Sequence, residues 1–181
     1  MNLGGGYLVN PDTPLEPFYE AVGLLGERFD VAVFIEPGAA IVRRAGSLVS
    51  TVIDVVEHGR TTLAYLDTTV NHMPEVYEYQ YEPDVLGHSD NGRFRYQLVG
   101  STCLAGDTFG QYSFDEPLEL GSRVVFPNMG AYTAVKSHMF NGVNLPATYL
   151  RRTTGELVLR KRFTYSDFAA IWGEEEADAS L

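Results

Sequence analysis

The sequence predicts an α+β protein in which a short α/β segment precedes an antiparallel β-domain of the sandwich or barrel type. Two observations predict this class: apolar residues recur at helical spacing before Gly46, and the pattern becomes extended beyond it. With 181 residues and 45% hydrophobic content, the chain is long enough to bury one ordinary core.

The α/β segment consists of one predicted helix and one predicted strand. The helix is expected because five apolar residues recur at spacings of three and four. These residues are Leu15, Phe18, Val22, Leu25 and Phe29. The continuous apolar run over residues 31–35 is typical of a strand buried on both faces in a parallel sheet. It ends at Glu36-Pro37-Gly38, so this turn and the glycines before the helix are expected at one carboxyl-end edge, where α/β folds bind ligands.

The β-domain is predicted from segments rich in Val, Ile, Thr, Tyr and Phe that alternate with turn signals. Strands are expected over residues 47–56, 61–67, 93–99, 123–126, 148–152 and 157–163. A closing helix is expected over residues 165–172, and the acidic residues 174–181 are expected to form a disordered tail. The predicted domains are therefore 1–45, 46–173 and 174–181.

Charge and cysteine content narrow the class of partner. Thirteen basic and 24 acidic residues give a net charge of −11, which disfavours nucleic acid and anionic membranes and is compatible with a cationic substrate. A single cysteine forbids an internal disulfide, and no basic-then-apolar signal pattern or membrane-length apolar run is present. A cytoplasmic location is expected. Four scattered histidines without paired spacing predict no metal site.

Four short segments carry the candidate chemistry. They are Gly4-Gly5-Gly6, Glu36-Pro37-Gly38, residues 101–107 around the only cysteine, and residues 130–133. Consecutive glycines can expose N–H groups and let the main chain approach a phosphate; the alternative is a flexible terminus. A carboxylate that ends a buried strand is costly unless a cation or a donor meets it; the alternative for Glu36 is a surface acid.

In this order the four segments resemble the C-terminal half of the fold-type III pyridoxal-phosphate decarboxylases, the alanine-racemase-like group. Residues 67–76 and 140–146 are most similar to the carboxynorspermidine/carboxyspermidine decarboxylases of polyamine biosynthesis. The resemblance extends from Leu3 to about Trp172. It implies that residues 1–45 are the last βα units, or remnant, of an incomplete (β/α)8 barrel.

The resemblance implies pyridoxal 5′-phosphate as the cofactor. The cofactor-binding residues that it implies are Gly4, Gly5, Gly6, Glu36, Gly38 and Tyr132. In the family, the triple glycine wraps the phosphate, the glutamate keeps the pyridine nitrogen protonated, and the tyrosine offers its phenol to the phosphate. Without the resemblance, Tyr132 is a strand aromatic that packs on the core.

The resemblance also implies a catalytic role for Cys103. A thiol with an ordinary pKa of about 8.5 is mostly protonated near neutral pH and can deliver a proton to the substrate carbon; the alternative is a buried structural cysteine. In the family this loop crosses a dimer interface to the partner's site. Asp107 would position a substrate ammonium group, or else act as a turn or capping acid. Glu78 is a further candidate contact for a polyamine, with a solvated surface acid as its alternative.

Two departures and one absence bear on activity. The ornithine enzymes carry an arginine just after Glu-Pro-Gly, where this chain has Ala39, and Tyr7 follows the triple glycine. Neither Lys136 nor Lys161 matches the lysine that binds the cofactor in the family, which belongs to its N-terminal half. The chain is therefore expected to need an N-terminal half or a full-length homologue, as a homo- or heterodimer, and to be inactive alone.

Three functions are compatible with these residues. The first is the C-terminal part of a carboxynorspermidine or carboxyspermidine decarboxylase whose site is assembled with that missing half. The second is a non-catalytic binding or dimerisation module. The third is a family decarboxylase for another amino acid, such as diaminopimelate.

Overall fold

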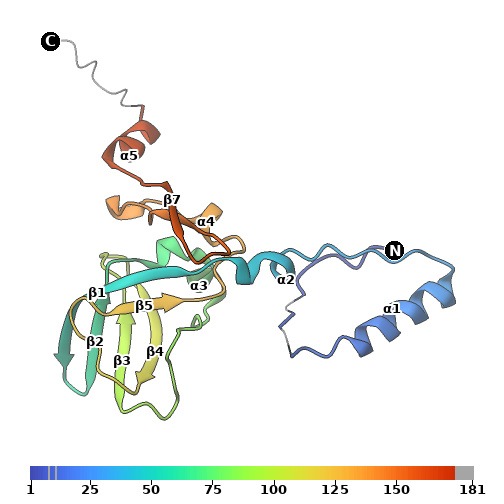
Figure 1. Cartoon of the computed structure of the whole chain (residues 1–181), viewed down its shortest axis with the longest axis horizontal. Helices are drawn as coiled ribbons and strands as arrows, with labels where there is room; N and C mark the ends of the chain where they lie inside the picture. The colour runs from blue at the N-terminus through green and yellow to red at the C-terminus, as the bar shows by residue number, and fades with distance from the viewer. Residues whose placement is uncertain (8, 11, 174–181) are drawn as a thin grey trace.

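A curved five-stranded sheet forms the centre of the computed structural model, which describes residues 1–7, 9–10 and 12–173. An N-terminal arm, residues 1–45, extends away from the sheet, and a two-stranded hairpin with a final helix projects in another direction (Figure 1). The predicted tail, 174–181, lies outside the described residues. No helix within the described part of the chain is long and apolar enough to cross a membrane.

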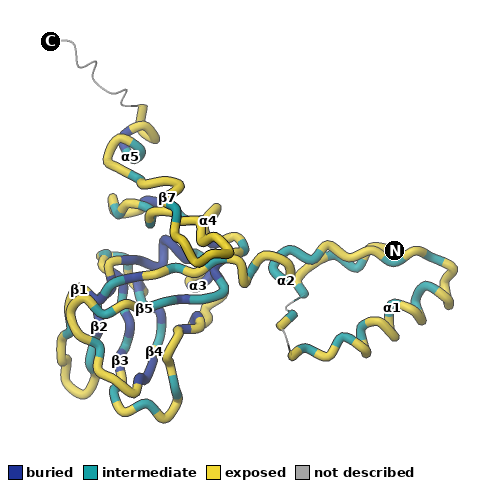
Figure 2. The backbone as a smooth tube through the Cα atoms, viewed as in Figure 1, coloured by how far each residue is buried: buried dark blue, intermediate teal, exposed yellow. Residues whose placement is uncertain are grey.

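The arm contains the predicted helix, α1 (Glu16–Phe29), followed by α2 (Ala39–Val42) and the 3₁₀ helix η1 (Arg43–Ala45). A proline in the first positions of α1 fits the missing donor of its first turn. The apolar stripe lies on one helical face, but it reaches only intermediate burial, and α1 contains no buried residue. The arm therefore folds locally with little core of its own (Figure 2).

Residues 31–35 do not form the predicted buried strand. Their only β-pairing is an isolated parallel bridge between Asn2 and Phe34, and the Phe34 residue is 62% exposed. An apolar run becomes buried on both faces only when strands flank it and other elements cover it. Among the described residues, the N-terminal segment is its single pairing partner, so the prediction of a buried strand was wrong.

The sheet contains most of the predicted strands, and its order is β4-β3-β2-β1-β5. Its strands are β1 (Leu48–His58), β2 (Thr61–Leu66), β3 (Phe94–Val99), β4 (Thr108–Phe114) and β5 (Arg123–Phe126). The pairings β1–β2, β1–β5 and β3–β4 are antiparallel, whereas β2 and β3 run parallel. The prediction of a fully antiparallel domain was therefore wrong, because strand direction depends on the connection between strands and not on their composition.

Strand β4 was missed because it contains Gly110, which weakens the strand pattern. Its φ is +131°, and a Cβ there would lie 2.5 Å from the Cδ of Glu82. Glycine inside a strand often marks such a close approach of another segment. Gly110 thus lets the side chain of Glu82 pack against the strand, although in the sequence a glycine at this position resembles the end of a strand.

The core lies against the sheet and includes Phe109 and Phe126, whose ring centroids are 5.1 Å apart. Two short helices, η2 (Val70–His72) and α3 (Pro74–Tyr79), connect β2 to β3, and two more, α4 (Thr133–Lys136) and η3 (Phe140–Gly142), follow β5. The chain then forms the hairpin β6 (Thr148–Arg151) and β7 (Leu157–Lys161), and ends its described part in α5 (Tyr165–Ile171). Buried residues concentrate in the sheet and in η2 and α3 (Figure 2).

Candidate active site

The triple glycine and the Glu36 turn lie side by side in the arm. The N–H of Leu3 donates to the carbonyl of Phe34 at 2.9 Å, and the N–H of Glu36 donates to the carbonyl of Gly4 at 2.7 Å. A Cβ on Gly5 would lie 2.5 Å from the carbonyl oxygen of Glu36. Only glycine at position 5 therefore lets these two segments approach so closely.

The carboxylate of Glu36 is held by the side-chain amide of Asn2, which donates to Oε1 at 2.6 Å. Both residues are exposed. The strand before Glu36 is not buried, so the desolvation cost that we predicted for this acid is absent. The hydrogen bond nevertheless fixes the direction of the carboxylate beside the triple glycine.

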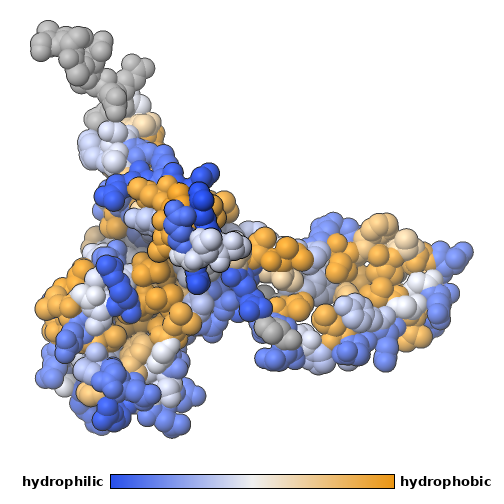
Figure 3. Space-filling view, viewed as in Figure 1, coloured by the Kyte–Doolittle hydropathy of each residue, from blue (hydrophilic) through white to orange (hydrophobic). Residues whose placement is uncertain are grey.

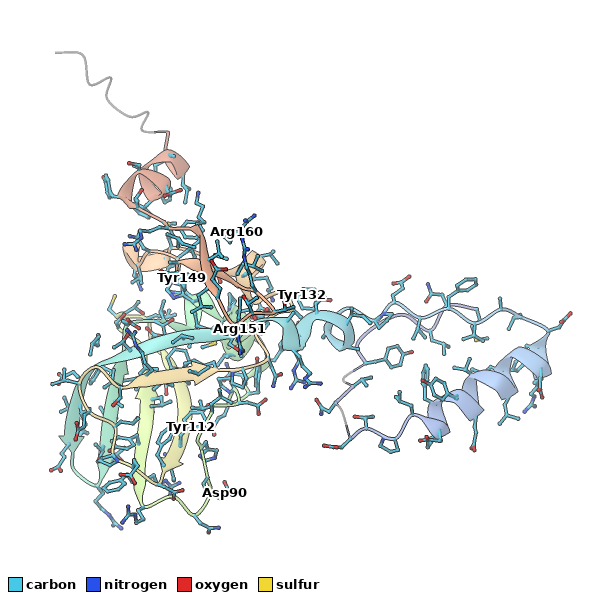
Figure 4. The ribbon with its side chains drawn as sticks, viewed as in Figure 1. Asp90, Tyr112, Tyr132, Tyr149, Arg151 and Arg160 are labelled. Atoms are coloured by element: carbon cyan, nitrogen blue, oxygen red, sulfur yellow. The ribbon has the colours of Figure 1, made fainter. Side chains whose placement is uncertain are left out.

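Tyr132 brings a third segment to the same place. A Cβ on Gly38 would lie 2.6 Å from the hydroxyl oxygen of Tyr132. Tyr132 has φ 63° and ψ −36°, a conformation that non-glycine residues rarely adopt. Its side chain is exposed at the junction between the arm and the rest of the chain, and not packed in the core as the alternative predicted (Figure 4).

The main chain before Tyr132 is attached to the end of the arm. The N–H of Gly130 donates to the carbonyl of Arg43 at 2.8 Å, and the N–H of Met129 donates to the carbonyl of Gly46 at 2.8 Å. These bonds hold the loop that carries Tyr132 against η1. The structure thus gathers Gly5, Glu36, Gly38 and Tyr132 from three distant segments; we call these residues, with Gly4 and Gly6, the glycine cradle.

The glycine cradle suits a phosphorylated aromatic cofactor. Gly4 and Gly6 have positive φ values of 71° and 85°, and a Cβ on either would meet no other atom within 4 Å. Open main chain of this kind can approach phosphate oxygens closely. The phenol of Tyr132 lies beside Gly38, and the carboxylate of Glu36 lies beside the N-terminal glycine segment; these are the two side-chain types that the resemblance implies. The residues present therefore fit this cofactor.

Cys103 lies in an exposed loop between β3 and β4. The loop is tied down by Asp107, which is only 8% exposed. One carboxylate oxygen of Asp107 accepts from the N–H of Thr102 at 3.0 Å and from its hydroxyl at 2.5 Å. The thiol is thus accessible on a loop whose base is fixed.

The other oxygen of Asp107 joins this loop to η2. It accepts from the N–H of Val70 at 2.8 Å and from the hydroxyl of Thr69 at 3.1 Å. Both oxygens are therefore occupied by internal donors, so Asp107 acts as a turn acid, the second of the two roles expected for it. Charge-assisted bonds to buried donors are strong ones, so Asp107 fixes where the Cys103 loop leaves the sheet.

Glu78 lies on α3 and forms an ion pair with Lys136 of α4. The ammonium group of Lys136 also lies 5.7 Å from the ring centroid of Tyr79. The hydrogen bond with Glu78 raises the pKa of Lys136 above its usual value. The candidate polyamine contact is therefore already occupied by a cation of the same chain, which residue patterns alone did not indicate.

His72 is a buried residue of η2, with Nδ1 2.9 Å from the hydroxyl oxygen of Thr68. Burial lowers the pKa of His72 to about 4, and the neighbouring Asp107 opposes this effect. The imidazole is therefore neutral near neutral pH.

Among the described residues, no group of three or more His, Cys, Asp or Glu side chains is placed to hold a metal ion.

The mixed sheet and the glycine cradle together define a sheet domain of the kind that completes a pyridoxal-phosphate enzyme. A family model described as the pyridoxal-dependent decarboxylase, C-terminal sheet domain, matches residues 18–130. The chain therefore belongs to the pyridoxal-dependent decarboxylase family, whose cofactor is pyridoxal phosphate, as the resemblance implied.

Curated relatives point to one branch of this family. The chain is 40% identical to a carboxyaminopropylagmatine decarboxylase from Synechocystis, over 93% of this chain and 45% of the relative. It is 32% identical to a carboxynorspermidine/carboxyspermidine decarboxylase from Herminiimonas arsenicoxydans, over 94% of this chain and 46% of the relative. The chain thus spans about half the length of the curated relatives that it matches.

A solved structure agrees with this assignment. The crystal structure of carboxynorspermidine decarboxylase from Campylobacter jejuni, complexed with norspermidine, superposes with a TM-score of 0.81 at 32% identity. The superposition covers 94% of this chain and 50% of that structure. The similarity to the carboxynorspermidine branch, expected from residues 67–76 and 140–146, is therefore confirmed.

Proposed function

We propose that this chain forms the C-terminal part of a pyridoxal-phosphate-dependent decarboxylase of polyamine biosynthesis. Its substrate would be a carboxylated polyamine of the carboxynorspermidine, carboxyspermidine or carboxyaminopropylagmatine type. The observation that supports the proposal is that Gly5 lies against Glu36 and Gly38 lies against Tyr132, because open main chain, a phenol and a carboxylate are groups that can hold a phosphate and a protonated ring nitrogen.

The roles of the cradle follow from its chemistry. The main chain at Gly4 and Gly6 and the hydroxyl of Tyr132 would hold the phosphate, and Glu36 would face the ring nitrogen. The bound cofactor supplies an electron sink for the electrons released when carbon dioxide leaves. Glu36 favours this chemistry because a carboxylate keeps a neighbouring nitrogen protonated, and the amide of Asn2 holds that carboxylate in direction.

Cys103 would return the proton to the substrate carbon. Its thiol is exposed, and the bonds of Asp107 hold the ends of its loop in place. The loop belongs to the sheet, whereas Glu36 belongs to the arm. We propose that Cys103 serves the cradle of a partner subunit in a dimer, and that Glu78 contacts the polyamine portion of the substrate.

The lysine that binds the cofactor would come from outside this chain. Lys136 pairs with Glu78, and Lys161 pairs with Asp167 at 2.7 Å. Both lysines are thus engaged in ion pairs, and Lys161 lies at the end of the β6–β7 hairpin. We propose that the arm continues a (β/α)8 barrel whose other units and lysine are supplied by a further stretch of polypeptide.

The test is reconstitution with the N-terminal half of the Synechocystis relative. The mixture should acquire the visible absorbance band of lysine-bound pyridoxal phosphate and release carbon dioxide from a carboxylated polyamine. Glu36→Gln and Tyr132→Phe should weaken the band, whereas Glu156→Gln, a distant acid, should not. A band from this chain alone that disappears in Lys136→Ala would contradict the proposal.

Cys103 has a separate test in the same mixture. Cys103→Ala should lower turnover by about 10²–10⁴-fold, the usual size of a general-acid contribution, and leave the absorbance band unchanged. An unchanged rate and product would remove the thiol from the mechanism.

A further inference from the structure

Asp84 lies where the sheet, the end of the arm and the loop before Tyr132 meet. Its Oδ2 atom accepts a hydrogen bond from the side-chain amide of Asn128 at 2.8 Å. The same atom lies 3.6 Å from Nη2 of Arg43, the first residue of η1. One carboxylate oxygen therefore contacts both the end of the arm and the loop that carries Tyr132.

The main chain on both sides of Asp84 is attached to the sheet. Pro83 is almost completely buried, and its carbonyl accepts from the hydroxyl of Tyr112 in β4 at 2.6 Å. The N–H of Leu86 donates to the carbonyl of Val125 in β5 at 3.0 Å. The carboxylate of Asp84 therefore has a fixed base, from which it reaches the arm and the loop.

The joint that these contacts bridge is built from two glycines. A Cβ on Gly130 would overlap the carbonyl oxygen of Val42, and a Cβ on Gly46 would lie 3.1 Å from the Cα of Gly130. No side chain therefore separates the arm from the loop at this point. Because glycine leaves the main chain unusually free to rotate, a contact outside the joint is needed to fix its angle. Asp84 makes such a contact on each side of the joint.

Tyr132 depends on this fixation because its own main chain has an unfavourable positive φ. A residue keeps such a conformation only when its surroundings impose it. On the C-terminal side, the carbonyl of Tyr132 accepts from the N–H of Lys136 at 2.9 Å. On the N-terminal side, the side chain of Asn128 ties the loop to Asp84, and its φ of 65° is one that asparagine tolerates.

We propose that Asp84 is a positioning residue of the glycine cradle. Its contact with Arg43 holds the arm, and its contact with Asn128 holds the loop. Together these contacts fix where the phenol of Tyr132 stands relative to Gly38, and hence relative to the phosphate of the cofactor. The inference rests on the proposed function for the identity of that cofactor. Asp84 acts through Asn128 and Arg43 and needs no contact with the cofactor itself.

The first test uses the full chain without any cofactor. In Asp84→Ala, hydrogen exchange at the amides of Met129 and Gly130 should accelerate about fivefold, the scale of one lost exposed hydrogen bond. The amides of β3 and β4 should keep their rates. The side chains of Arg43 and Asp84 are 27% and 65% exposed, and such ion pairs contribute little net stability, so the sheet should stay folded.

Two further variants sharpen this test. Asn128→Gly permits the positive φ and removes the amide, so it should reproduce the faster exchange of Asp84→Ala. Asp90→Ala is the matched control, because Asp90 is a fully exposed acid of the same connection and lies far from Tyr132 (Figure 4). It should leave both amides within about twofold of their original rates. Circular dichroism identifies any variant that fails to fold.

The second test measures the affinity for pyridoxal phosphate in the reconstituted mixture, from the absorbance band at increasing cofactor concentration. Asp84→Ala should weaken the affinity about fivefold, and Asp84→Asn, which keeps an acceptor oxygen for Asn128, should recover part of the loss. In the Tyr132→Phe background, Asp84→Ala should cause no further loss, because a positioning residue acts through the phenol that is already absent. Fully additive losses would show that Asp84 acts by another route and would overturn the inference.

The outcomes separate this inference from the proposed function. Unaltered exchange at Met129 and Gly130 in both Asp84→Ala and Asn128→Gly would overturn the positioning role, even if reconstitution yields an active enzyme. Faster exchange in both variants together with a failed reconstitution would support the role of Asp84 at the joint and would sink only the decarboxylase proposal.

Discussion

In the five-stranded sheet, Leu66, Phe109 and Phe126 are almost completely buried, whereas α1 in the arm contains no buried residue. Both regions carry apolar patterns in the sequence. The sheet has a second layer in η2 and α3, and the described part of the arm has none. In the space-filling view, apolar surface therefore remains visible along the arm (Figure 3). Periodicity thus predicts which face of an element is apolar, and the neighbouring elements decide whether that face is buried.

The largest expected change in the free energy of unfolding tests this contrast with one substitution in the sheet and one in the arm. Phe109→Ala should lower the free energy of unfolding by about 3–5 kcal/mol, because it leaves a cavity in a packed core. Phe34→Ala, at an exposed position of the arm, should change it by less than about 0.5 kcal/mol. Denaturant titration measures both. Comparable losses would show that the arm has a core that its exposure does not reveal.

The second effect is the pH dependence of unfolding that is expected from His72, which is buried in η2. Burial lowers the pKa of His72 from 6.5 to about 4, so the unfolded state binds a proton more readily than the folded state. The stabilisation that comes from keeping His72 neutral is therefore fully present above about pH 6.5. It is lost as the pH falls toward 4, and the free energy of unfolding then decreases by up to about 3 kcal/mol. The groups beside this imidazole are Asp107 and His138.

His72→Gln should remove most of that slope in unfolding experiments between pH 6.5 and 4. His58→Gln, at an exposed position at the end of β1, is the matched control and should keep it. An unchanged slope in His72→Gln would assign the acid sensitivity to other groups.

The third effect concerns the Cys103 loop. Asp107→Ala leaves the buried N–H of Val70 and the N–H of Thr102 without their acceptor and should cost about 1–3 kcal/mol. The more specific readout is the rate of Cys103 alkylation, which should change because the loop loses its attachment to η2. Asp115→Ala, an exposed acid after β4, should alter neither. An unaltered alkylation rate in a folded Asp107→Ala protein would separate the carboxylate from the position of the thiol.

The smallest effect on global stability is expected at Gly5. A Cβ there would lie 2.5 Å from the carbonyl oxygen of Glu36, so Gly5→Ala should separate the two segments of the arm and leave the unfolding of the sheet within about 0.5 kcal/mol of the original. Hydrogen exchange should accelerate at the amides of Phe34 and Glu36, which donate across this pairing. A shift of the main unfolding transition would mean that the arm and the sheet unfold together.

The sequence was sufficient where a segment's own residues determine its structure. The strand predicted over residues 123–126 coincides with β5, and the helix predicted from the stripe at Leu15 to Phe29 is α1. The sequence was insufficient where contacts with distant segments determine the local structure or the direction of a strand. Gly110 concealed β4 because its role depends on Glu82, and the parallel pairing of β2 with β3 depends on the route of the chain.

In the candidate site, too, some features could be predicted from the sequence and others depend on contacts between distant segments. The resemblance indicated Gly5, Glu36, Gly38 and Tyr132, and the structure places them together. The sequence pattern did not indicate the pairing of Lys136 with Glu78, because the two residues lie on different helices and meet only after folding. It likewise left the role of Asp107 open, since its partners Val70 and Thr69 come from another segment.

The parallel pairing of β2 and β3 has one further consequence. Antiparallel neighbours can be joined by a turn of about two residues, whereas parallel neighbours need a long return segment. Residues 67–93 make that return here, and they carry both Asn71 and Glu78. A single parallel pair therefore requires a long connection between β2 and β3, and this connection carries short helices and polar side chains that a two-residue turn could not.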